Sequence, residues 1–136
     1  MEVSQKKGGV SWVKELVDLA LENISSKEMF LFQIRCAECG TVHTSKAVRF
    51  TKAGIIPETK GKAHIYQVLY EQEGVRARRE AIRDVMEQIN YCPICRRMIC
   101  NRCFLICEDL DMCCRCAAQL EERGSPVLSD TLETAI

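Results

Sequence analysis

The chain has 136 residues, of which 47% are hydrophobic, and its 19 Lys and Arg balance 19 Asp and Glu. This length fits a single domain, and the hydrophobic content is sufficient for a core. No apolar stretch approaches the ~20 residues of a membrane-spanning helix, and the polar first residues lack the apolar run of a secretory signal. We therefore expect no membrane partner, and we expect an intracellular, cytoplasmic protein in a reducing compartment.

Charge is unevenly distributed along the chain. Residues 40–103 carry a surplus of Lys and Arg, whereas residues 104–136 carry a surplus of Asp and Glu. The basic middle and the acidic tail could form two separate contact surfaces, or the tail could cover the middle.

The N-terminal part predicts one helix. Residues 1–10 are polar and predict a disordered start. Residues 11–25 place apolar side chains at helical spacing and predict an amphipathic helix. Its apolar stripe, residues 12–24, could pack on its own domain, bind a partner helix or mediate a homo-oligomer.

Short strands and a loop are expected next. The dense apolar run Met29–Ile34 predicts a strand that leads into Cys36, and residues 41–48 are expected to return as a second strand. Residues 51–62 contain two Gly, one Pro and several Lys, which is typical of a loop.

A long helix is predicted between the first cysteines and the rest. Apolar residues recur at helical spacing over residues 62–90, and Gly74 interrupts them. Either one helix includes this glycine at a cost of about 1 kcal/mol, or two helices meet there.

The remaining residues predict a cysteine-rich core and a tail. Residues 91–124 hold most of the cysteines and end in a short helix that Gly124 would terminate. Residues 125–136 predict a flexible acidic tail. We expect residues 11–124 to form one zinc-binding domain of the α+β class, a small treble-clef or zinc-ribbon module with a long inserted helix.

The strongest signal in the sequence is its ten cysteines, eight of which form C-x2-C pairs. A two-residue gap aims both sulfurs at one point, and two such pairs complete a tetrahedral thiolate shell for zinc. Eight ligands therefore predict two Zn²⁺ ions. The predicted ligands are Cys36, Cys39, Cys92, Cys95, Cys100, Cys103, Cys113 and Cys116.

Two pairings of these ligands fit the spacing. In the sequential pairing the first pair joins the second and the third joins the fourth; in the interleaved pairing the first joins the third and the second joins the fourth. An iron–sulfur cluster is a chemical rival, because Cys95, Cys100 and Cys103 match a ferredoxin spacing. Cys107 and Cys114 remain as buried spares or substitute ligands, and His43 is expected to be a surface or strand histidine or an alternative ligand.

The middle string, Cys92-Pro-Ile-Cys95-Arg-Arg-Met-Ile-Cys100-Asn-Arg-Cys103, resembles the centre of cross-brace treble-clef zinc modules, the group that holds FYVE, PHD and RING domains. Cys113 and Cys116 with their trailing helix look like the last ligand pair of a FYVE-type domain. The resemblance covers roughly residues 91–123 plus the first pair, and it implies zinc with interleaved ligands. The FYVE phosphoinositide motif and the ligand His of RING and PHD domains are absent, so no single family is assigned.

These observations favour a binding module over an enzyme. All-thiolate zinc shells are closed and are poor Lewis acids, and no catalytic constellation is present. We therefore expect an adaptor that binds a protein partner. The alternative is nucleic-acid binding by the basic region 46–102. Its candidate residues are Lys46, Arg49, Arg76, Arg78, Arg79, Arg83, Arg96 and Arg97.

Overall fold

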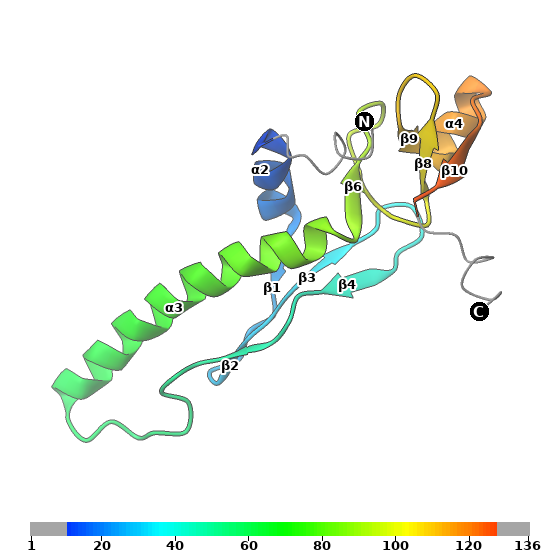
Figure 1. Ribbon diagram of the computed structural model, residues 1–136. Coiled ribbons are helices and arrows are strands. Elements are labelled where there is room, and N and C mark those ends of the chain that lie inside the picture. The colour runs from blue at the N-terminus through cyan, green and yellow to red at the C-terminus, as the bar shows by residue number, and fades with distance from the viewer. Residues whose placement is uncertain (1–10, 128–136) are drawn as a thin grey trace.

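The computed structural model describes residues 11–127, in which three helices are combined with short antiparallel strand pairs (Figure 1). This confirms the α+β class at the level of mixed helix and small sheets. Residues 1–10 and 128–136, predicted as a disordered start and a tail, lie outside the described range. The elements are α2 (Ser11–Ala20), β1 (Glu22–Asn23), β2 (Met29–Phe30), β3 (Phe32–Arg35), β4 (Val42–Thr44), β5 (Val48–Arg49), α3 (Lys60–Met86), β6 (Ile89–Tyr91), β7 (Met98–Cys100), β8 (Phe104–Cys107), β9 (Met112–Cys113), α4 (Cys114–Leu120) and β10 (Gly124–Pro126).

Antiparallel hairpins set the positions of the cysteine pairs. The strand orders are β1-β3-β4, β10-β8-β9, β2-β5 and β6-β7. Arg35 pairs with Val42 at the end of β3–β4, and Tyr91 pairs with Met98 at the end of β6–β7. Residues 36–40 and 92–96 therefore lie at the tips of two hairpins. We call these tips the first and the second knuckle.

The long helix α3 is continuous through Gly74. Its N-cap is Thr59, whose side chain accepts a hydrogen bond from the backbone N–H of Lys62. A Cβ atom at Gly74 would lie 3.3 Å from a ring carbon of Phe30. The sequence did not decide between one helix and two helices here, and the structure has one. The glycine lets the Phe30 ring approach the helix closely.

Small residues continue this contact toward the C-terminal end of α3. Ala77, Ala81 and Val85 are its buried side chains, and they recur at helical spacing on one face. Farther toward the N-terminal end, the ring of Tyr70 lies 4.8 Å from that of Phe30 and 5.2 Å from that of Phe50 (centroid distances). The strands therefore cover one side of α3 only.

Helix α2 packs against α3, and an ion pair joins the two helices. Val17 is fully buried. Arg78 Nε on α3 donates to Asp18 Oδ1 at 2.5 Å, and the Arg78 guanidinium lies 5.5 Å from the centroid of the Phe32 ring. This is the packing on its own domain that the sequence offered as one of three uses of the helix.

Three element predictions are corrected. The helix predicted over 11–25 ends at Ala20, and Glu22 begins β1. The strand predicted over Met29–Ile34 is interrupted at Leu31, whose N–H donates to Ser25 Oγ instead of joining a ladder. The helix predicted over 62–90 ends at Met86, because residues 89–91 pair with β7.

The C-terminal boundary is also corrected. Helix α4 ends at Leu120, and its C-cap is Glu121, which adopts φ 59, so Gly124 is not its terminator. Gly124 belongs to β10 instead, where an added Cβ would lie 2.6 Å from the carbonyl oxygen of Ile106. Residues 125–127, predicted as tail, are part of the fold, since β10 pairs with β8 and Val127 N–H donates to Phe104 O.

None of the helices within residues 11–127 combines the length and the apolar character needed to cross a bilayer.

The close contact between Gly74 and the Phe30 ring predicts that substitution of Gly74 costs more stability than substitution of the next residue. Gly74→Leu should destabilise the protein by about 1–3 kcal/mol, because the new side chain must displace the Phe30 ring. The neighbouring control Val75→Leu should stay within about 0.5 kcal/mol, since Val75 is exposed. Urea denaturation at a fixed metal concentration measures both; equal stabilities would show that Phe30 does not require the glycine.

Candidate metal centres

The eight paired cysteines gather into two groups of four sulfurs. Within each group all Sγ atoms lie within 4.8 Å of one another, so that each group could hold a metal ion. The pairing is interleaved, which decides between the two arrangements that the sequence left open. Centre 1 consists of Cys36, Cys39, Cys100 and Cys103; centre 2 consists of Cys92, Cys95, Cys113 and Cys116.

Two short chain segments run between the centres and produce this interleaving. The second knuckle contributes to centre 2, and strand β7 then carries the chain to Cys100 of centre 1. Cys103 of centre 1 directly precedes β8, and β9, which pairs with β8, returns the chain to Cys113 of centre 2. Neither centre can therefore form without the segments that also build the other.

The sulfur separations fit tetrahedral coordination. A tetrahedron with metal–sulfur bonds of about 2.3 Å has edges of about 3.8 Å. The Sγ atoms of Cys39 and Cys100 are 3.7 Å apart, and those of Cys95 and Cys113 are 3.8 Å apart. All ten cysteines are free thiols, and these distances far exceed the ~2.05 Å of a disulfide bond.

Backbone N–H groups point at the sulfurs. Cys36 Sγ accepts from the N–H groups of Glu38, Cys39 and Cys100 at 3.4, 3.5 and 3.2 Å. In centre 2, Cys92 Sγ accepts from Cys113 N–H at 3.3 Å, and Cys113 Sγ accepts from Cys116 N–H at 3.4 Å. Such donors stabilise thiolates, which are the form that binds metal.

The two knuckles have the same kind of backbone turn. Gly40 N–H donates to Cys36 O, and the corresponding N–H of Arg96 donates to Cys92 O. Gly40 has φ 81 and Arg96 has φ 63, so both residues adopt the left-handed conformation that favours glycine. The second knuckle thus holds a non-glycine residue in a strained position.

The thiol pKa values show why each group favours a cation. The Thr41 hydroxyl and N–H donate to the Cys39 thiolate and lower its pKa to about 6. Burial opposes ionisation of Cys95, but hydrogen bonds from Arg97 and from nearby sulfurs lower its pKa to about 7. Burial, together with nearby sulfurs, raises the pKa of Cys103 and of Cys116. One thiol in each group ionises readily, and four crowded thiolates need a bound cation.

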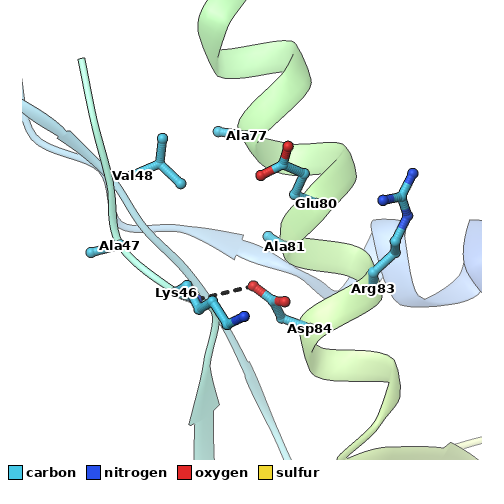
Figure 2. Close-up of a pocket in the computed structure, with 8 residues that line it drawn as sticks. All are labelled: Lys46, Ala47, Val48, Ala77, Glu80, Ala81, Arg83 and Asp84. Atoms are coloured by element: carbon cyan, nitrogen blue, oxygen red, sulfur yellow. Dashed lines mark hydrogen bonds between the residues drawn. The ribbon is translucent and has the colours of Figure 1, made fainter. Parts of the chain in front are cut away.

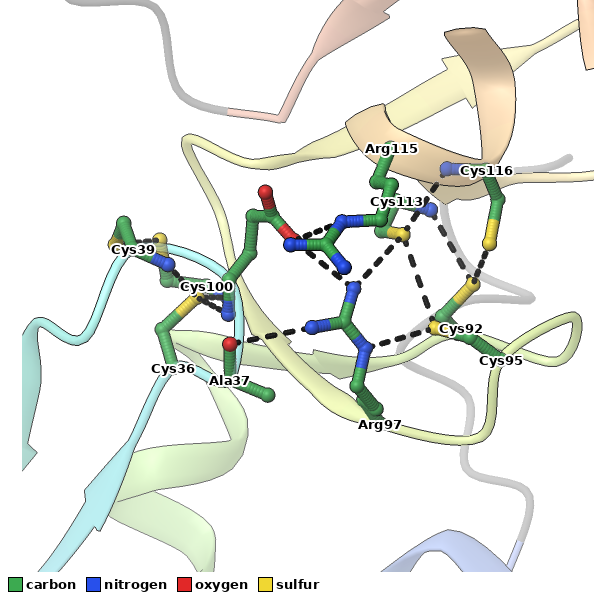
Figure 3. Close-up of polar contacts among 11 residues, drawn as sticks. Cys36, Ala37, Cys39, Cys92, Cys95, Arg97, Cys100, Cys113, Arg115 and Cys116 are labelled. Atoms are coloured by element: carbon green, nitrogen blue, oxygen red, sulfur yellow. Dashed lines mark hydrogen bonds and ion pairs between the residues drawn. The ribbon is translucent and has the colours of Figure 1, made fainter. Parts of the chain in front are cut away.

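An ion network connects the two knuckles (Figure 3). Arg97 Nη2 donates to Glu38 Oε1 at 2.9 Å, and Arg115 Nε lies 3.2 Å from the same oxygen. Arg97 Nε also donates to Cys95 Sγ at 3.2 Å. These arginines hold the pKa of the Glu38 carboxyl below its ordinary value. Sequence reasoning missed Glu38 and Arg115 and assigned Arg97 to nucleic acid, because only the interleaved fold brings them together.

The alternative ligands lie outside both groups. Cys107 and Cys114 are half-buried and belong to neither group. His43 lies in β4, where its Nδ1 donates to Gln88 Oε1 at 2.9 Å. An iron–sulfur cluster held together by Cys95, Cys100 and Cys103 is contradicted, because Cys95 lies in centre 2 whereas Cys100 and Cys103 lie in centre 1.

The predicted nucleic-acid residues are scattered over the fold. Arg78 and Arg97 are engaged in internal ion pairs with Asp18 and Glu38. Arg76, Arg79 and Arg83 are exposed along α3. Lys46 and Arg49 lie in the β4–β5 segment, and Arg96 occupies the second knuckle.

A cavity of about 320 Å³ lies between α3 and the segment 46–48 (Figure 2). It is lined by both signs of charge, and the Lys46 N–H donates to Asp84 Oδ2 at 3.1 Å. No cysteine lines it. Its charges are balanced within the protein, so it gives no reason to assign a ligand.

Comparison with known proteins leaves the geometry as the basis for function. No protein-family model, curated protein or solved structure matches this chain. The zinc-module resemblance is therefore supported only by the two cysteine groups.

The strained turn at Arg96 gives a stability prediction. Arg96→Gly should stabilise the metal-loaded protein by up to about 1 kcal/mol, since a left-handed residue with a Cβ costs about 1–2 kcal/mol, part of which the greater backbone entropy of unfolded glycine offsets. Gly40→Ala in the first knuckle should have the opposite sign. Thermal unfolding at fixed zinc concentration compares them; a shift of the same sign for both would contradict the shared turn.

Proposed function

We propose that this protein is a zinc-stabilised adaptor that presents one face of α3 to a protein partner. The observation that carries the proposal is the pair of interleaved four-cysteine groups, combined with a long helix, α3, whose outward face remains exposed. The metal ions hold the fold and take no part in chemistry.

Zinc is the ion that these groups fit best. Four sulfur ligands in a tetrahedral arrangement are typical of structural zinc. Thiolates are soft ligands, whereas magnesium and calcium prefer oxygen ligands. A shell of four cysteines leaves no position for water or substrate. The interleaving and the helix that begins at Cys114 support a cross-brace module of the treble-clef type.

The proposed binding surface is the outer face of α3, which we define by Ile65, Val68, Val75, Arg76, Arg79 and Arg83. All six are exposed. Val68 and Val75 are seven residues apart and share one side of the helix. The buried Ala77 is nine residues from Val68, or two and a half turns, and therefore lies on the opposite side.

The composition of this face favours a protein partner with an acidic, amphipathic segment. Ile65, Val68 and Val75 are 50%, 38% and 59% exposed and supply apolar contact area. The three arginines supply charge that would complement acidic side chains. No aromatic side chain lies among the six residues to stack on bases.

Nucleic-acid binding is the second candidate, and the same arginines favour it. Arg76, Arg79 and Arg83 are exposed and could contact phosphates. Arg78 and Arg97 are less suited, because each already pairs with a carboxylate of this chain.

The metal content of the purified protein tests the zinc-binding part of the proposal. Native mass spectrometry should show two zinc ions per chain, and a strong chelator should remove them and unfold the protein, because metal-binding free energy is part of the folding free energy. Circular dichroism records the unfolding. Protein that is folded without metal, or that retains iron, would contradict the proposal.

The partner class is tested by a photo-crosslinking residue at position 75. Adducts with protein are expected in cells, and Val68→Glu in the same chain should reduce them strongly by placing a charge in the apolar contact. A crosslinker at the exposed Glu108, on the β8–β9 loop, serves as a matched control.

Oligonucleotide binding distinguishes the alternative. Fluorescence anisotropy with labelled single-stranded and duplex RNA and DNA should show weak binding that falls steeply with salt. Tight binding at physiological salt that still weakens steeply with added salt, as phosphate contacts require, and that Arg79→Glu abolishes, with RNA or DNA adducts from position 75, would favour nucleic acid instead.

A further inference from the structure

One contact crosses between the two metal centres. Glu38 lies between Cys36 and Cys39 in the first knuckle and so belongs to centre 1 by position. Its carboxylate accepts a hydrogen bond from Arg97, whose guanidinium reaches the sulfurs of centre 2: Cys95 Sγ at 3.2 Å and Cys113 Sγ at 3.7 Å.

We propose that Arg97 couples the two centres: the first knuckle, ordered by metal at centre 1, positions Arg97 on the sulfurs of centre 2. This inference rests on the proposed zinc-binding function. Arg97 is a positioning residue in this account, because it contacts the sulfur ligands and not the metal itself.

Each of the three guanidinium nitrogens of Arg97 donates to a group in one of the two centres. Nη1 donates to the carbonyl oxygen of Ala37 at 3.2 Å, and Nη2 donates to Glu38, both in the first knuckle. Nε donates to Cys95 in the second knuckle. Figure 3 shows the guanidinium between the two sets of cysteines. A planar fork of fixed geometry can make these contacts together, whereas a lysine ammonium cannot.

Charge gives this contact its strength. Four thiolates and one divalent cation leave a formal charge of −2 at a centre, and the Arg97 guanidinium offsets part of it at centre 2. The side chains of Arg97 and Glu38 are 26% and 20% exposed, so water screens their interaction only in part. Arg115 contacts Glu38 from α4 and holds the carboxylate in place.

Backbone contacts join the first knuckle to the strand that follows the second. Ala37 N–H donates to Met98 O at 2.8 Å, and Cys100 N–H donates to Cys36 Sγ at 3.2 Å. Ordering residues 36–39 around a metal therefore fixes both the Ala37 carbonyl and the Glu38 carboxylate toward Arg97. By linkage, metal at centre 2 must favour metal at centre 1 to the same degree.

The coupling predicts that a change in the first knuckle affects metal binding at centre 2. Glu38→Gln changes a residue of the first knuckle, yet it should weaken metal retention at centre 2. Changes to groups that orient metal ligands typically cost 10–100-fold in affinity. We expect chelator-induced metal loss from centre 2 to accelerate by about tenfold or more, together with the weaker metal binding at centre 1 that reciprocity requires.

The measurement is site-resolved thiol alkylation of the zinc-loaded full chain. A chelator is added, released cysteines are alkylated over time, and peptide mass mapping reports centres 1 and 2 separately. Arg97→Lys, which keeps the charge but not the fork, should reproduce the effect of Glu38→Gln. The double variant should be no worse than Arg97→Lys alone, because both changes remove the same contact.

Arg35→Gln is the matched control. Arg35 Nη1 donates to Gly40 O at 3.0 Å, so it contacts the turn of the first knuckle, and none of its described contacts involves centre 2. This variant should leave the release rate of centre 2 unchanged.

The outcomes separate this inference from the proposed function. Wild-type protein whose eight cysteines are alkylated at once, without chelator, overturns zinc binding itself. Wild-type protein that protects both centres, with Glu38→Gln and Arg97→Lys leaving the release rate of centre 2 unchanged or accelerating centre 1 alone, leaves zinc binding intact and overturns the coupling.

Discussion

The structure depends on the convergence of thiolates from distant parts of the chain. Cys36 and Cys100 share one group although 64 residues separate them, and Cys36 Sγ accepts a hydrogen bond from the Cys100 N–H. Small two- to four-residue strands contribute little stability alone. A metal ion held by these thiolates would close such long loops and would supply stability that the modest core does not.

This constraint determines how the remaining parts are used. The interleaved segments fix one end of the molecule, and α3 extends away from that end with strands on only one of its sides (Figure 1). Its opposite side, with Ile65, Val68 and Val75, is available because no segment described in residues 11–127 buries it. The two cysteine groups, the scaffold and the exposed face of α3 are thus separate parts of one chain.

The sequence predicted those features that depend on local spacing. C-x2-C pairs and helical periodicity identified the eight cysteines and α3, because both patterns act over a few residues. Element ends were missed where tertiary pairing overrides spacing, as at residues 89–91, which join a ladder with β7. The contacts of Arg97 were missed for a related reason: its partners Glu38 and Cys113 are distant in sequence, and from its charge alone Arg97 could be offered only as a phosphate-binding residue.

The central claim is that the two metal ions have interleaved ligands. Cadmium–proton correlation NMR of the cadmium-substituted protein tests it directly, because each ion couples to the β-protons of its own cysteines. One ion should couple to Cys36, Cys39, Cys100 and Cys103, and the other to Cys92, Cys95, Cys113 and Cys116. An ion that couples to Cys36, Cys39, Cys92 and Cys95 together would contradict the account.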